Sequence, residues 1–162
     1  RRAFNLSSHK RNNNLYIWKT SKLSEELKDN KVPDSDWIKY ALIFLIFYTV
    51  TPYLMFLAPY VSNEVMITEA IGILVVSILG VIVTYRTNNR DGKTYILRSI
   101  ALSIPLSFRF VALSVLVGMA IVSFDFGAQH YFIVELLSTF SVIALQALYF
   151  WRLNVHLKYI NS

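Results

Sequence analysis

The stretch Ser99–Phe124, SIALSIPLSFRFVALSVLVGMAIVSF, decides the fold of this chain. It holds fourteen Leu, Ile, Phe and Val residues and a single cation, Arg109. At about 1.5 Å per residue, a helix of this length is longer than a hydrocarbon layer of about 30 Å. The run therefore predicts a membrane-spanning helix with a charge inside it.

Arg109 needs a partner. Counted from Arg98 along a straight helix, it lies roughly 16 Å into the hydrocarbon layer, close to the midplane. Inserting a central Arg costs about 2.5 to 3.5 kcal/mol, and each large apolar residue returns at most about 0.3 to 0.6 kcal/mol, so the segment still inserts. Because the guanidinium does not deprotonate, we expect it to face a partner, a water-filled cavity or the bundle interior.

The composition extends this reading to the whole chain. Its 162 residues are 55% hydrophobic and have a mean hydropathy of +0.46, which indicates one membrane domain. Cysteine is absent from the sequence, so a disulfide framework or a Cys-based metal or redox site is excluded. The sequence predicts an all-α membrane protein, a four-transmembrane-helix bundle with spans at about 37–59, 66–85, 95–124 and 131–151.

The first span is preceded by a polar and basic segment, residues 1–36. Residues 22–30 form a predicted amphipathic helix, capped by Ser21, with Leu23 and Leu27 on one face. This segment either lies on anionic headgroups or provides a docking surface for a soluble partner. Candidate contacts to a partner or to the membrane surface are Arg11, Lys19, Lys22 and Lys28.

The distribution of basic residues predicts the orientation. Of the sixteen Lys and Arg residues, nine lie at or before Lys39, four flank the loop between the second and third spans, and two lie at the end of the chain. The positive-inside rule then places both termini and the middle loop in the cytoplasm. The transmembrane domain covers residues 37–153, and residues 154–162 form a cytoplasmic tail. If the source is a bacterium, we expect this membrane to be the plasma or inner membrane. Topology thus explains the basic charge, and no nucleic-acid partner is predicted.

Prolines and small residues shape the predicted helices. Pro52 and Pro105 lie within spans and predict kinks, because proline removes a backbone donor and crowds the preceding turn. Small residues on one stripe of a membrane helix allow another helix to approach closely. The candidate packing positions are Gly72, Gly80, Ser107, Ser114 and Gly118.

The other intramembrane polar residues that we take as functional candidates are Arg98, Glu69, Glu135 and Gln146. By depth, Gln146 is the easier partner for Arg109 within one subunit. Glu135 or Glu69 is reachable only if a helix shifts or water bridges the gap. Arg109 and Gln146 either hold helices together through hydrogen bonds or form a charged ring or gating cation.

Catalytic motifs are absent from the sequence, which has no H-E-x-x-H, G-x-S-x-G or P-loop pattern. His9, His130 and His156 are spread over different regions, so paired haem ligation is not expected. We predict no enzyme activity, no cofactor and no metal site.

These features predict a non-catalytic membrane subunit of a larger assembly, which acts as a membrane anchor or sensor for a cytoplasmic partner. Membrane subunits of bacterial defence or stress modules share this architecture, which is an analogy of architecture alone. The alternative is a homo-oligomeric ion channel or small-solute pore with Arg109 near the path. A membrane subunit of a respiratory or lipid-modifying complex is the third reading. The expected partners are the lipid bilayer and either further copies of the chain or a cytoplasmic protein subunit.

Overall fold

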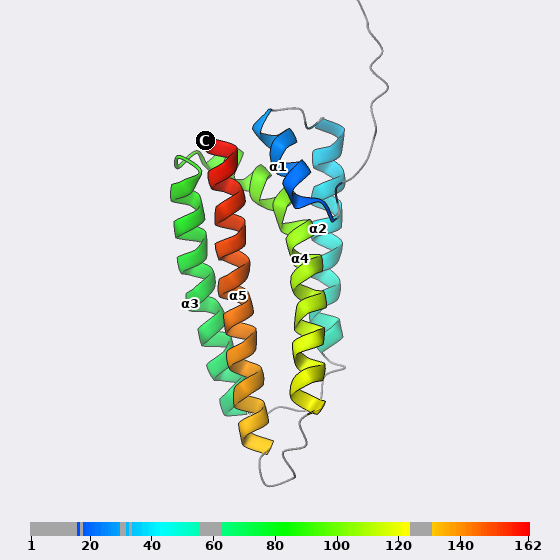
Figure 1. Ribbon diagram of the computed structural model, residues 1–162, viewed down its shortest axis with the longest axis vertical. Helices are drawn as coiled ribbons and strands as arrows, with labels where there is room; N and C mark the ends of the chain where they lie inside the picture. The colour runs from blue at the N-terminus through cyan, green and yellow to red at the C-terminus, as the bar shows by residue number, and fades with distance from the viewer. Residues whose placement is uncertain (1–15, 17, 30–31, 33, 56–62, 124–130) are drawn as a thin grey trace, which may run out of the picture.

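The computed structural model describes residues 16, 18–29, 32, 34–55, 63–123 and 131–162. The described part is entirely helical or irregular and has no strand, so the all-α prediction is confirmed. Its five helices are shown in Figure 1: α1 (Thr20–Lys28), α2 (Asp34–Met55), α3 (Asn63–Thr87), α4 (Gly92–Ser123) and α5 (Tyr131–Asn161).

Among the described residues, three helices are long and apolar enough to cross a membrane. They cover Asn63–Thr87, Thr94–Ile121 and Phe132–Asn161. The chain is therefore an integral, multi-pass membrane protein. Helix α2 coincides with most of the predicted first span, whose last residues, 56–59, lie outside the described part of the chain.

The long helices form two neighbouring pairs that run along the same axis. Helix α3 packs along α5, α2 packs along α4, and α4 contacts α5 to join the pairs. The short helix α1 contacts α4 and α5 at the end of the bundle where the chain finishes (Figure 1). At that same end the turn between α3 and α4 places Asn89 and Arg90 in the left-handed region, with φ of 56° and 60°.

Two glycines allow α3 to approach α5 closely. A Cβ atom at Gly72 would overlap the side chain of Ile143, and one at Gly80 would overlap the ring of Phe150. Gly118 of α4 differs, since a Cβ there would meet nothing within 4 Å. The small residues of α3 are thus used for packing within the chain.

The buried core is concentrated at the α1 end. Leu23 and Leu27 of α1 are almost fully buried, and they pack with residues from α2, α4 and α5. Further along the bundle the apolar side chains face outward, as expected for helices solvated by lipid tails. The buried cluster consists of Leu23, Leu27, Tyr40, Ala101, Leu102, Ile104, Leu106, Leu153, Leu157 and Ile160.

Helix α4 is bent in its first half, and Figure 1 shows its beginning crossing the end of the bundle before the helix turns along the common axis. Pro105 lies inside this helix, and the residues from Ala101 to Leu106 are all buried. A proline within a helix removes one hydrogen bond and opens the preceding turn. Pro52 lies within α2, which continues to Met55, and the kink expected there stays a prediction.

Two boundaries differ from those predicted. Helix α1 begins at Thr20, and its N-cap is Lys19, which makes no side-chain capping bond. Ser21 is therefore inside the helix and does not cap it, because the first helical bond already runs from the Leu23 amide to the Lys19 carbonyl, at 3.1 Å. Helix α5 continues to Asn161, through the residues expected to form a tail.

Candidate functional site

Arg109 binds the segment that precedes α1. Its guanidinium donates a hydrogen bond to the backbone carbonyl of Trp18. The sequence expectation that Gln146 is the easier partner is therefore not met. The count along a straight helix ignores the bend of α4 that Figure 1 shows. The contact with Trp18, which directly precedes α1, places Arg109 near the α1 end of the bundle.

The same segment has further contacts with the bundle. The amide of Tyr16 donates to the hydroxyl of Tyr40 in α2, at 3.3 Å. The indole of Trp18 lies against the ring of Phe108 in α4, with the ring centroids 5.9 Å apart. The Tyr16 hydroxyl donates to Glu26 of α1 at 2.7 Å, and this bond to a carboxylate raises the pKa of Tyr16 above its ordinary value of 10.0.

Helix α1 is joined to α5 by a buried polar contact. Ser24 Oγ lies 2.9 Å from His156 Nδ1, and it also donates to the carbonyl of Thr20, at 2.9 Å. Because the single hydroxyl proton goes to Thr20, the arrangement fits a His156 ring that carries its proton on Nδ1. The other ring nitrogen, Nε2, is buried without a hydrogen-bond partner among the described residues. We call this set of contacts, from Tyr16 to Leu27 against α2, α4 and α5, the α1 junction.

Arg98 belongs to a second polar cluster at the same end. It donates to Asn88 Oδ1 at 3.0 Å and to Asn161 Oδ1 at 2.8 Å. Asn161 in turn donates to the carbonyl of Thr87, at 3.0 Å. Arg98 thus connects the turn between α3 and α4 to the last turn of α5. Its positive charge strengthens hydrogen bonds that hold these two segments together.

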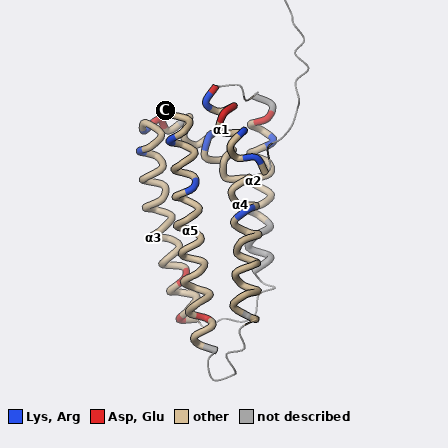
Figure 2. The backbone as a smooth tube through the Cα atoms, viewed as in Figure 1, with Lys and Arg blue, Asp and Glu red and all other residues tan. Residues whose placement is uncertain are grey.

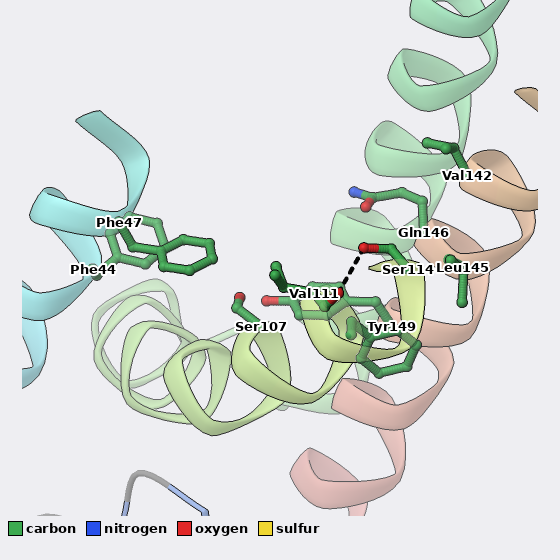
Figure 3. Close-up of a pocket in the computed structure, with 10 residues that line it drawn as sticks. Phe44, Phe47, Ser107, Val111, Ser114, Val142, Leu145, Gln146 and Tyr149 are labelled. Carbon is green, nitrogen blue, oxygen red and sulfur yellow. Dashed lines mark hydrogen bonds between the residues drawn. The ribbon is translucent and has the colours of Figure 1, made fainter. Parts of the chain in front are cut away.

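Gln146 lines a cavity between the two helix pairs. The cavity measures about 460 Å³ and is bounded by α2, α4 and α5. Figure 3 shows Phe44 and Phe47 on one side and Gln146 and Tyr149 on the other, with Ser107 and Val111 of α4 between them. Gln146 donates to Ser77 Oγ at 3.2 Å, and Tyr149 donates to Ser103 Oγ at 2.7 Å. Ser114 also lines the cavity, and the rest of the lining, Phe110, Val142 and Leu145, is apolar.

The acidic candidates lie at the other end of the bundle. Glu64 and Glu69 are in the first turns of α3, and Glu135 is in the first turns of α5. Figure 2 shows these acidic positions far from the Lys and Arg residues, which gather at the α1 end among some acidic ones. The structure therefore does not bring Glu69 or Glu135 to Arg109.

The predicted surface lysines occupy different environments on and before α1. Lys19 and Lys22 are exposed. Lys28 lies over the ring of Tyr159 in α5, 5.0 Å from its centroid. Arg11 is outside the described residues.

Sequence reasoning missed His156, Trp18 and the pair Asn88 and Asn161. One signal for His156 was available, because it shares a helical face with Leu153, Leu157 and Ile160, all of which are buried. Trp18 gave no such signal, since its contact with Arg109 joins positions 91 residues apart.

Comparison of the chain with protein-family models, with curated proteins and with solved structures finds no match. Within the described residues, no group of three or more His, Cys, Asp or Glu side chains is placed to hold a metal ion.

Proposed function

We propose that this protein is a non-catalytic membrane subunit that anchors a cytoplasmic partner and senses the state of the membrane for it. The observation that carries the proposal is the α1 junction. A helix outside the spans is held against α4 and α5 by buried leucines, by Ser24 and by Arg109. A movement of either span would reach α1 through these contacts.

In this proposal the chain has four spans, with α2 as the first, and both termini are cytoplasmic. The gathering of Lys and Arg at the α1 end supports this orientation, because basic loops are retained in the cytoplasm. The partner binds the face of α1 that points away from the bundle. Among its residues, Ser21, Lys22, Glu25 and Lys28 are exposed, and such a polar, charged face suits a soluble protein.

The contacts of Arg109 favour this function over an oligomeric pore with Arg109 near its path. The guanidinium is engaged by the Trp18 carbonyl. The cavity between the helix pairs is lined by the α4 residues Ser107, Phe110, Val111 and Ser114. At 100° per residue, Arg109 points to the opposite side of α4 from these four.

Co-purification tests the proposal. The full chain is gently solubilised from its native membrane, either unaltered or as the double variant Lys19→Glu, Lys22→Glu. The matched control, Arg86→Glu with Arg90→Glu, reverses two exposed charges, one in the last turn of α3 and one in the turn between α3 and α4. We expect a soluble protein to accompany the unaltered chain and the control but not the first variant. Equal recovery from all three would contradict docking on α1.

A further inference from the structure

The cavity between the two helix pairs has aromatic walls and no charge. Its volume of about 460 Å³ falls within the range of small-molecule sites, roughly 300–1,000 Å³. Among the described residues that line it, none is charged. A charged ligand would lose its hydration there without meeting an opposite charge, so the cavity suits an uncharged molecule. The aromatic residues of its wall are Phe44, Phe47, Phe110 and Tyr149.

Two hydroxyl groups at the cavity donate their protons within the protein. The Ser103 hydroxyl donates to the Ser99 carbonyl at 2.6 Å, so in its 2.7 Å contact with Tyr149 the tyrosine is the donor. Ser114 donates to the carbonyl of Val111 at 2.8 Å, which is the dashed line in Figure 3. A ligand therefore finds the oxygens of Tyr149 and Ser114 as hydrogen-bond acceptors.

The amide of Gln146 adds a third acceptor. It extends from α5 into the space between the helix pairs (Figure 3). Its Nε2 donates to Ser77 Oγ in α3 at 3.2 Å, and its Oε1 accepts no hydrogen bond within the part of the chain that the structure describes. An amide oxygen in apolar surroundings is costly to leave unpaired. A ligand hydroxyl can donate to Oε1, whereas a ligand carbonyl only accepts and leaves Oε1 unpaired.

The depth of Gln146 restricts the ligand further. Gln146 is the middle residue of α5, a helix of 31 residues. Arg152 is the nearest charged residue along this helix, and six residues correspond to about 9 Å. Gln146 therefore lies within the hydrocarbon layer. Phospholipids and diacylglycerols keep their polar groups at the interface, because their ester groups hold them there. An uncharged ring with a hydroxyl group moves freely within the hydrocarbon and can reach this depth.

We propose that the cavity binds a membrane quinol, the reduced and hydroxyl-bearing form of a quinone. One ring hydroxyl donates to Gln146 Oε1, and the ring packs against Phe44 and Phe47, as aromatic rings prefer. The site selects the reduced form, because the oxidised form brings only carbonyl acceptors. Quinol binding would give the sensing role its signal, and that use rests on the proposed function. Binding itself requires no soluble partner.

The test measures binding of tritiated decylubiquinol to the full chain in phosphatidylcholine nanodiscs under anaerobic conditions, with uptake by empty nanodiscs subtracted. Two competitors have nearly the same shape but no hydroxyl donor: decylubiquinone and the dimethyl ether of decylubiquinol. We expect unlabelled decylubiquinol to displace the tritiated ligand at a concentration about tenfold below that of either competitor, the difference expected from one hydrogen bond. Equal displacement by the three compounds would overturn the proposal.

Variants assign the binding to this cavity. Gln146→Leu should weaken decylubiquinol binding about tenfold. Ser77→Ala is the matched control, because it breaks the same bond between α3 and α5 but leaves the cavity lining unchanged, and it should bind like the unaltered chain. If Gln146→Leu fails to fold, Val111→Trp keeps the test decisive, since Val111 lines the cavity and is 45% exposed.

The indole of Val111→Trp should fill the cavity and abolish binding. Binding by Val111→Trp equal to that of the unaltered chain would overturn the proposal, as would an absence of decylubiquinol uptake by the unaltered chain. The second result would assign the cavity to phospholipid acyl chains instead. Quinol can bind while no soluble protein co-purifies, so this proposal and the anchoring function fail separately.

Discussion

Ser24 in α1 and His156 in α5 lie 132 positions apart in the chain, yet Ser24 Oγ is 2.9 Å from His156 Nδ1. Ser24 is 0% exposed and His156 is 8% exposed, so water does not reach this contact readily. The surrounding leucines can pack in several ways, but a buried polar group has to meet a hydrogen-bond partner. The bond therefore fixes the position of α1 on the bundle.

Ser24→Ala should lower the free energy of unfolding by about 1 to 3 kcal/mol, because it leaves the buried Nδ1 of His156 without a partner. Replacing both residues, as Ser24→Ala with His156→Leu, should recover much of that loss, because both polar groups are then removed. Thermal unfolding in detergent measures these two variants and the single change His156→Leu. A double variant as unstable as the sum of the two single changes would contradict the contact.

Gly80→Ala should destabilise the packing of α3 on α5 by about 1 to 3 kcal/mol, because the added methyl group overlaps the ring of Phe150. Gly118→Ala is the matched control. Its methyl group meets nothing, and alanine favours a helix over glycine by about 1 kcal/mol in soluble hosts. The unfolding temperatures of the two variants should therefore move in opposite directions, and equal shifts would contradict the close approach of α3 and α5.

Arg98→Ala should lower the free energy of unfolding by about 2 kcal/mol, because the side-chain oxygens of Asn88 and Asn161 lose a charged donor. Arg98→Lys should recover only part of the loss, since both bonds come from the Nη1 atom of Arg98 and the ammonium group of lysine does not reproduce the reach and planar geometry of a guanidinium group. Asn161→Ala tests the same cluster from α5. If Arg98→Ala unfolds like the unaltered chain, the cluster does not hold the turn to α5.

The chain has no cysteine, which makes thiol labelling a direct measure of orientation. In intact cells, a membrane-impermeant maleimide should label Glu64→Cys and leave Asn89→Cys unlabelled until the membrane is opened. Both positions are exposed and lie at opposite ends of α3. The reverse pattern would place the α1 end outside and contradict a cytoplasmic partner.

The helices could be predicted because each span is a long apolar run with polar breaks, a pattern that depends on local sequence alone. The second predicted span, 66–85, lies inside α3, which covers Asn63–Thr87. Leu23 and Leu27 could likewise be placed on one face of a short helix from their spacing, and both are buried.

The surroundings of Arg109 could not be predicted in the same way. A count along a straight helix does not give its depth, because α4 is bent. Its partner is a backbone carbonyl in a segment 91 positions earlier, and a backbone group carries no sequence signal. The buried contact of His156 with Ser24 depends in the same manner on how α1 folds back over the bundle.

The anchoring function is tested most directly by the mass of the gently solubilised native complex, with every co-purifying component identified. We predict a soluble protein in stoichiometric amount, present with the unaltered chain and lost when Lys19 and Lys22 are changed to Glu. A complex that contains only copies of this chain would contradict the anchoring function and favour a pore built around an axis.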